Sequence, residues 1–311
     1  MGAAFPALSS TSTQELITLG VIGILFYGNL KGVKEAGRLF AAPTYLFVVA
    51  VSSIIVVGLW REVHHTLQHV PVGAGNVGYG HSQQLITFAS IFILLKAFAN
   101  GGSSLTGLEA ISNGVSLFKS PEGNNARRTT VIMATILGCM VLGISFFAKA
   151  TQALPYSSGT PTVVSQIAAI VFGHGTLGHI FYLFVQFSTM LILYTGANTP
   201  FSGFPFLMNF IAEDGFLPRQ LTKRGHRLVF SNGIMVLTIA AATLVAVVGS
   251  NVAKLIAFYA IGVFTGFTMA GFGMAKRNWT LRSEGWRIRF FINFLSGMVS
   301  FAVAILPVKA D

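Results

Sequence analysis

Charged side chains are scarce in this 311-residue chain. Only 9% of its residues are charged, whereas 53% are hydrophobic, and the mean hydropathy is +0.71. Soluble globular domains carry roughly 25% charged residues, so the composition excludes that class. Repeated runs of about 18–22 apolar residues bounded by charges are typical of polytopic helical membrane proteins. We therefore expect an all-α protein embedded in the lipid bilayer.

Cysteine and acidic residues are also rare. The one cysteine, Cys139, lies inside an apolar run, which excludes an internal disulfide and favours a small packing residue. Nine acids stand against 20 Lys and Arg, giving a net charge of +11. The basic residues fall in short connections between apolar runs, a pattern of membrane topology rather than of nucleic-acid binding. No nucleic-acid partner is expected.

The apolar runs predict about eight membrane helices. The first is short for a full crossing, and the third is about a dozen residues longer than one crossing needs. An additional stretch at 162–173 is too short to span and suits a helix lying over the outer mouth. The predicted spans are 16–30, 39–60, 85–118, 129–150, 177–205, 230–249, 255–275 and 290–307.

The basic residues assign an orientation to these spans. The numbers of Lys and Arg in the seven connections are 3, 1, 3, 0, 4, 1 and 5. The positive-inside rule places the basic connections in the cytoplasm, namely 31–38, 119–128, 211–229 and 276–289. A multi-pass protein of the cell membrane is thus predicted, with both ends of the chain outside. That placement leads us to expect that earlier helices precede the first span.

The third span contains an unusual polar stretch, "NGGSSLTGLEAISNG" at 100–114. Of the nine acids, Glu109 alone falls well within an apolar span, and an ionised carboxylate at that depth costs several kcal/mol. It must be protonated, paired or facing a wet cavity. Gly101, Gly102 and Gly107 weaken the helix around it, which predicts two half-helices joined by an unwound segment near 100–107.

An unwound segment in the membrane is tolerated where its backbone lines a cavity or a ligand. Ser103, Ser104 and Thr106 would add hydroxyl oxygens there, and Glu109 lies about one turn after Thr106 on a similar face. We therefore predict an ion or substrate site in the broken helix of 85–118. The alternative is a glycine-rich helix packed tightly against a neighbour, with Glu109 bound to a distant arginine.

Enzymatic and transition-metal sites are less well supported. His65 and His69 would be an i, i+4 metal-binding pair if helical, but a solvated or interfacial loop is favoured. Ser202-Gly203 is similar to the motif of intramembrane serine proteases, yet Pro200 stands where that motif needs glycine. No enzyme, cofactor or transition metal is expected.

Three segments resemble the amino acid–polyamine–organocation (APC) superfamily of permeases. "NLKGVKEAGRLFAAPTYLFVV" resembles the junction of their fourth and fifth helices, "SLTGLEAISNGVSLFKSPEGNNARRT" their broken sixth helix, and "GANTPFSGFPFLMNFIAEDGFLPRQL" the end of their eighth. The details "TGLEAISNG" and "GANTPFSGFP" are closer still to the KUP-like potassium importers of the KimA group. The resemblance covers nearly the whole chain.

The resemblance implies a LeuT-type fold of two five-helix inverted repeats. On this basis residues 1–311 are a single transmembrane transporter domain, a fragment that corresponds to helices four to eleven. The resemblance also implies potassium uptake coupled to protons. It assigns Thr106 and Glu109 to the ion pathway, with Glu109 as the proton-coupling group, and it adds Tyr259 from the tenth helix. The ligands that the group carries on helices one and three have no counterpart here.

Three functions stay open at this point. The first is a proton-coupled potassium importer, which the glutamate of "TGLE" favours, with K⁺ transported and H⁺ as the coupling ion. The second is an amino acid permease, whose substrate carboxylate would meet half-helix N-terminal amides, where a glutamate is less welcome. The third is a truncated product or a subunit that needs a partner chain. The expected partners are the bilayer and a small cation or amino acid, with a homodimer as an open option.

Overall fold

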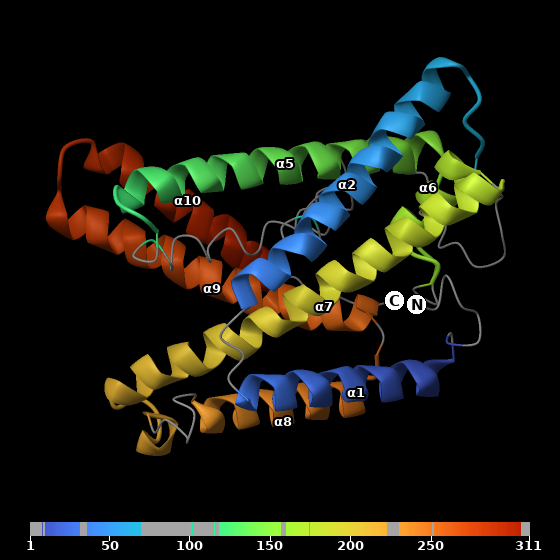
Figure 1. Ribbon diagram of the computed structural model, residues 1–311. Coiled ribbons are helices and arrows are strands. Elements are labelled where there is room, and N and C mark those ends of the chain that lie inside the picture. The colour runs from blue at the N-terminus through green and yellow to red at the C-terminus, as the bar shows by residue number, and fades with distance from the viewer. Residues whose placement is uncertain are drawn as a thin grey trace. The chain divides into compact units, whose positions relative to one another are not determined.

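A computed structural model gives the fold of most of the chain. It describes residues 8, 10–31, 36–69, 97, 101, 115, 118–156, 160–173, 175–222, 230–250 and 252–305, with side chains left undescribed at 36–40, 202, 253, 254 and 257. The regular elements within these residues are helical (Figure 1). They are α1 (Thr11–Leu30), α2 (Ala36–Val63), α5 (Glu122–Ala150), α6 (Val163–Phe172), α7 (Thr176–Glu213), the 3-10 helix η4 (Arg219–Thr222), α8 (Ser231–Val248), α9 (Val252–Leu281) and α10 (Trp286–Ile305).

Six helices of the described part are long and apolar enough to cross a membrane. They lie in α2, α5, α7, α8, α9 and α10. The all-helical, multi-pass membrane class predicted from the sequence is thus confirmed. The third predicted span, 85–118, lies almost wholly outside the described residues, so its break stays a prediction.

Helix α1 differs from the first predicted span. It begins at Thr11 rather than at residue 16, because the Ser10 side chain caps the helix by accepting a hydrogen bond from the Thr13 amide. Its first turns, "TSTQE", are polar, and α1 is not among the six helices that qualify as spans. Local capping therefore lengthened this helix with residues that an apolar pattern does not detect.

Several predicted loops are in fact helix ends. The connection predicted at 276–289 shrinks to four residues, since α9 continues to Leu281 and α10 begins at Trp286. Likewise α5 begins at Glu122 and α7 continues to Glu213. Long basic side chains on a terminal helical turn can still reach the membrane surface, so charge marks the interface without ending the helix.

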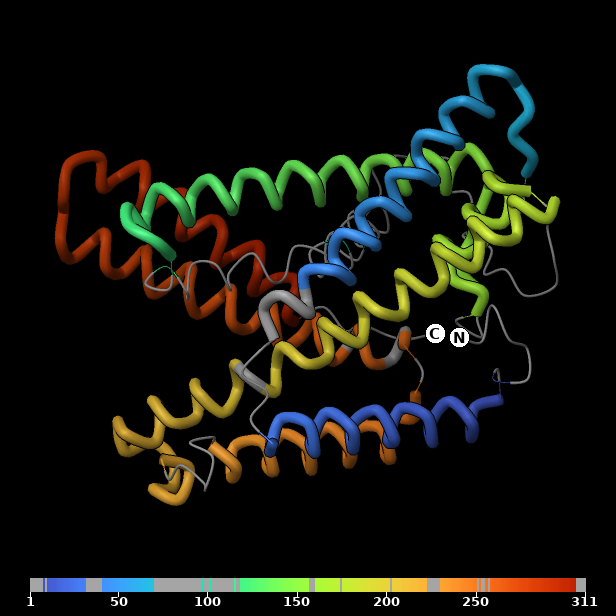
Figure 2. The backbone as a smooth tube through the Cα atoms, in the orientation of Figure 1, coloured from blue at the N-terminus to red at the C-terminus, as the bar shows by residue number. Residues whose placement is uncertain are grey.

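The chain divides into two compact units, which we describe separately. Unit 1 contains residues 1–78 and 138–250, and unit 2 contains residues 79–137 and 251–311. In unit 1, α7 contacts α1, α2, α6 and α8, and α1 lies beside α8 (Figure 2). The short helix α6 confirms the helix predicted at 162–173, with Thr162 as its N-cap and Gly173, at φ 73°, following its end. Its position over an outer mouth stays a prediction.

The core of unit 1 forms where α2, the second half of α5, α6 and α7 meet. Phe147 is fully buried there, together with Ile54, Ile167 and Val185. Gly58 lets the Phe147 ring approach α2, because a Cβ at Gly58 would lie 2.7 Å from the ring. Close packing of this kind holds helices together in lipid, where burial of apolar surface alone provides little driving force.

Unit 2 contains the hairpin of α9 and α10. Ala260 and Phe264 of α9 are buried against Val303 of α10. Nearer the turn the two backbones approach closely, since a Cβ on Gly271 would lie 2.8 Å from the Gly297 Cα. Small residues at such a crossing allow the van der Waals contact that associates membrane helices.

Candidate functional site

The predicted ion site lies mostly outside the described residues. This applies to Ser103, Ser104, Thr106 and Glu109, and to the glycines at 102 and 107. Their proposed roles, and the unwound segment itself, therefore stay predictions. The described members of the predicted site are Gly101 and Tyr259, and both belong to unit 2.

Tyr259 is positioned by the packing of α9 on α10. Its neighbour Ala260 and Phe264, one turn further on, face α10 and are buried. One residue corresponds to a rotation of about 100° around a helix, which turns Tyr259 off that face. Its side chain is accordingly 46% exposed. A phenolic oxygen can accept a hydrogen bond or coordinate a cation, so Tyr259 can contribute one oxygen to a site on this side of α9.

Gly101 has helical backbone conformation. No heavy atom lies within 4 Å of the position that a Cβ would occupy, so its surroundings in the described structure are open. Residues 102–114, which include the rest of the break predicted near 100–107, are not described.

His64, His65 and His69 do not form the helical pair that a metal site would need. Helix α2 ends at Val63, before all of them. Nδ1 of His64 bonds to the Trp60 carbonyl at 2.8 Å, and Nδ1 of His69 bonds to the Ala150 carbonyl at 3.0 Å. Within the part of the chain that the structure describes, no three His, Cys, Asp or Glu residues gather as metal ligands. His69 instead ties the segment after α2 to the end of α5.

Arg61 anchors α6 in unit 1. The sequence placed it in an outer loop, but it lies in the last turn of α2 and donates a hydrogen bond to the Ile170 carbonyl at 2.9 Å. That carbonyl belongs to the last turn of α6, where backbone acceptors lack helical partners and carry partial negative charge. The guanidinium also lies against Gly173, 3.3 Å from the position of a Cβ there. In the sequence, the available signal for this contact was an arginine within one turn of the end of an apolar helix.

Polar side chains also join α6 to α7. Ser165 is buried; its hydroxyl accepts a hydrogen bond from Gln186 Nε2 at 2.8 Å and lies 3.0 Å from the Tyr182 hydroxyl. The adjacent Gln166 donates from Nε2 to the carbonyls of Leu154 and Pro161. Its Oε1 is buried and has no partner within the described structure. These contacts fix the register of α6, which its apolar pattern alone does not set.

An amide pair joins α1 to α7. Asn29 Nδ2 donates to Asn198 Oδ1 at 2.6 Å and to the Leu25 carbonyl at 2.8 Å. Asn198 lies in "GANTPFSGFP", the second of the two motifs that carried the resemblance. Polar side chains inside apolar helices are the signal for such contacts, but which two side chains meet follows from packing.

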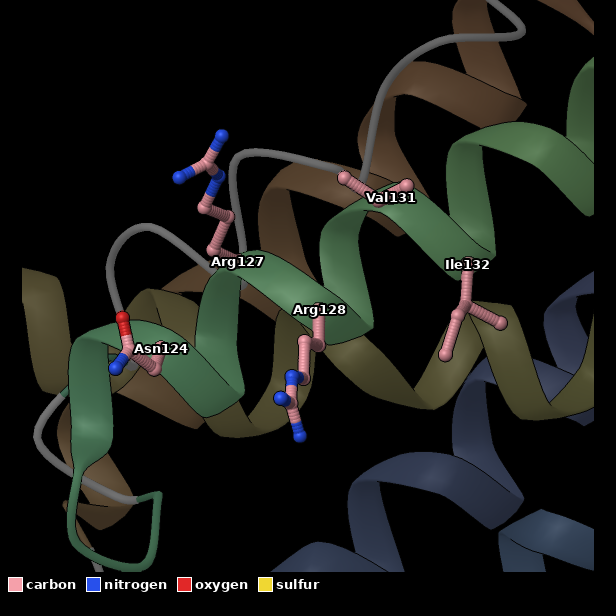
Figure 3. A pocket seen from close by; sticks show the side chains of 5 residues that line it. All are labelled: Asn124, Arg127, Arg128, Val131 and Ile132. Carbon is pink, nitrogen blue, oxygen red and sulfur yellow. The ribbon is translucent and has the colours of Figure 1, made fainter.

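A shallow hollow of about 490 Å³ lies on the first turns of α5. It is lined by Asn124, Arg127, Arg128, Val131 and Ile132, all from this one helix. Figure 3 shows the two arginines extending from α5 in different directions. Because their guanidinium groups diverge, they do not enclose a ligand between them.

A family model described as amino acid permease matches residues 1–308 of the chain. This chain belongs to the amino acid permease family. That family is part of the APC superfamily, which confirms the superfamily predicted from the sequence and makes the chain a multi-pass protein of a membrane transporter family.

The chain is also similar to the potassium transporter KimA of Bacillus subtilis (strain 168). The two are 38% identical over 304 residues, which cover 96% of this chain and 47% of the relative. The permease chain thus spans about half the length of the relative that it matches. The correspondence with helices four to eleven stays a prediction.

Proposed function

We propose that this permease chain takes part in proton-coupled potassium uptake. The supporting observation is its 38% identity with a potassium transporter over 96% of its own length. The match extends over nearly the whole chain, so it is not confined to one motif. The role of each residue follows from its chemistry.

A dehydrated potassium ion needs several oxygen ligands. Thr106, Ser103 and Ser104 offer hydroxyl groups, Tyr259 a phenol, and an unwound helix its backbone carbonyls. The four side chains alone supply fewer oxygens than a complete shell, so backbone carbonyls and further residues contribute the others. Glu109 accepts and releases the coupled proton, since a lone acid at bilayer depth is favoured in its neutral form unless a cation or water faces it.

The direct test measures potassium uptake in a strain that lacks its own importers, using the complete encoded protein. We expect uptake to rise with an inward proton gradient. Glu109→Gln should abolish the pH dependence of uptake, whereas Glu122→Gln, an exposed acid in the first turn of α5, should preserve it. Unchanged pH dependence in Glu109→Gln would remove the proton role from that residue.

Tyr259 is tested by removing one oxygen. Tyr259→Phe keeps the ring and the helix but lacks the hydroxyl, so the KM for potassium should rise several-fold with little change in protein level. Tyr45→Phe, an exposed tyrosine on α2, is the matched control and should leave the KM unchanged. An unaltered KM in Tyr259→Phe excludes the phenol from the ion shell.

A second candidate is an amino acid permease, which the description of the matching family favours. Uptake of labelled amino acids into proteoliposomes, with no effect of potassium, would support it and contradict the first proposal.

A third candidate is a chain that needs a partner. If the 311-residue chain alone fails to transport while the complete encoded protein succeeds, the remaining helices supply part of the site. The mass of the 311-residue chain in solution then shows whether it associates with a second copy.

A further inference from the structure

The turn between α9 and α10 carries a cluster of basic and indole side chains. Trp279 and Trp286 meet edge to face, with ring centroids 5.4 Å apart. The Arg282 guanidinium lies 5.7 and 5.6 Å from these two rings, and that of Arg287 lies 5.8 Å from Trp286. We name these four residues the basic–indole tip. Both guanidinium groups therefore lie beside the Trp286 ring at the end of the hairpin.

The charge of this region is strongly positive. Residues 276–289 contain five basic residues and a single acid, Glu284. Neither Arg282 nor Arg287 has an ion-pair partner in the part of the chain that the structure describes. Their guanidinium N–H groups are therefore available to an anion. Planar N–H forks match phosphate oxygens well, and this pairing is stronger than a contact between neutral groups.

An exposed apolar stripe begins beside the tip. Ile288, Phe291, Ile292 and Leu295 lie on one face of α10 at i, i+3, i+4 and i+7, and all are exposed. The surface thus changes from basic to apolar within one helical turn. Trp279, which is 51% exposed, packs against Trp286 and Phe290 at the end of the hairpin. Indoles concentrate at the headgroup level of membranes, where one part of the ring meets lipid and the N–H meets water.

We propose that the basic–indole tip binds the phosphate headgroup of an anionic phospholipid, with an acyl chain along the stripe from Ile288 to Leu295. The charge selects an anion, and the adjoining apolar stripe selects one that carries a hydrocarbon chain. Clusters of Lys and Arg beside a membrane helix attract anionic lipids by this means. The arginines of the α5 hollow differ, because they diverge and no indole holds them.

The backbone conformation of Arg282 suggests a substitution that removes its charge without straining the turn. Its φ is 45°, in the left-handed region where asparagine and glycine are tolerated better than other residues. Arg282→Asn removes the guanidinium while suiting the backbone. Combined with Arg287→Gln, it gives a neutral tip that retains both indoles and the apolar stripe.

Tryptophan fluorescence reports on this site directly. The chain has three tryptophans, and Trp60→Phe leaves only the two of the tip. The 311-residue chain in this background is placed in phosphatidylcholine vesicles that contain a small fraction of either dibrominated phosphatidylglycerol or dibrominated phosphatidylcholine. We expect stronger quenching by the anionic lipid. The neutral-tip pair should lower that selectivity by about fivefold for each arginine removed.

Matched variants and competitors separate the outcomes. Arg127→Gln with Arg128→Gln removes the same charge from α5 and should keep the selectivity. Quenching by brominated phosphatidylcholine should persist in the neutral-tip pair, which shows that the hairpin still sits at the interface. Equal quenching by the two lipids in the parent chain overturns the proposal, as does selectivity that survives in the neutral-tip pair. Loss of the selective quenching in millimolar inorganic phosphate would assign the site to free phosphate and also overturns it.

Discussion

Helix α6 and the α9–α10 hairpin are held in place by different means. In unit 1, α6 covers a buried core around Phe147 and is tied to its neighbours by side chains such as Arg61 and Ser165. In unit 2, α9 and α10 contact along their length through small and aromatic residues, with Gly271 against Gly297. A ten-residue helix has few residues to bury, so directed polar contacts position it. Long helices such as α9 and α10 are positioned instead by close contact between their backbones.

The largest expected effect concerns the core under α6. Phe147→Ala removes a fully buried ring and leaves a cavity, which should lower the free energy of unfolding by about 3 kcal/mol. Phe146→Ala is the matched control, because the neighbouring ring is 49% exposed and should cost far less. Far-UV circular dichroism in mixed detergent titrations measures both. Equal losses would mean that α6 does not depend on this core.

The α9–α10 hairpin should be destabilised by a substitution at its glycine contact. Gly271→Ala places a Cβ against the backbone of Gly297, which cannot rotate away, so the helices must separate at a cost of about 2 kcal/mol. Gly273→Ala adds the same methyl where nothing lies within 4 Å and should be neutral or slightly stabilising. If the two variants unfold alike, close contact does not hold the hairpin.

The anchor of α6 should have a smaller, local effect. Arg61→Gln leaves the Ile170 carbonyl without its charged donor and should cost about 1 kcal/mol. The loss should show as faster amide hydrogen exchange in α6, with the α9–α10 hairpin unchanged. Arg61→Lys retains a positive donor and should restore part of the protection. Uniform exchange across both regions would contradict a local anchor.

The smallest effect is expected for the amide pair between α1 and α7. Asn29→Ala and Asn198→Ala each remove one partner of the 2.6 Å contact. A double-mutant cycle should give a coupling of about 0.6 kcal/mol, the usual size of an interhelical hydrogen bond in a membrane. A coupling near zero would leave apolar packing as the main link between these helices.

Within the described residues, the sequence predicted the apolar helices better than it predicted their ends. The span at 230–249 matches α8 (Ser231–Val248) closely, because an apolar run with polar flanks directly reflects contact with lipid. The predicted loop at 276–289 was wrong by several residues at each end, since basic residues on terminal turns remain helical. Within the candidate site, the sequence selected Tyr259 by resemblance, and the packing of α9 explains its exposure.

Composition and apolar periodicity determined by themselves that this is a helical membrane protein, the resemblance of its motifs indicated the APC type, and the sequence singled out Glu109 as an acid within an apolar span. Those features are local, since hydropathy and charge act on each segment separately. Tertiary structure decided which side chains meet. Arg61 finds a carbonyl 109 positions away, and Trp279 meets Trp286 across a turn. Such pairs depend on the crossing of helices in space, and no single segment of the sequence contains that information.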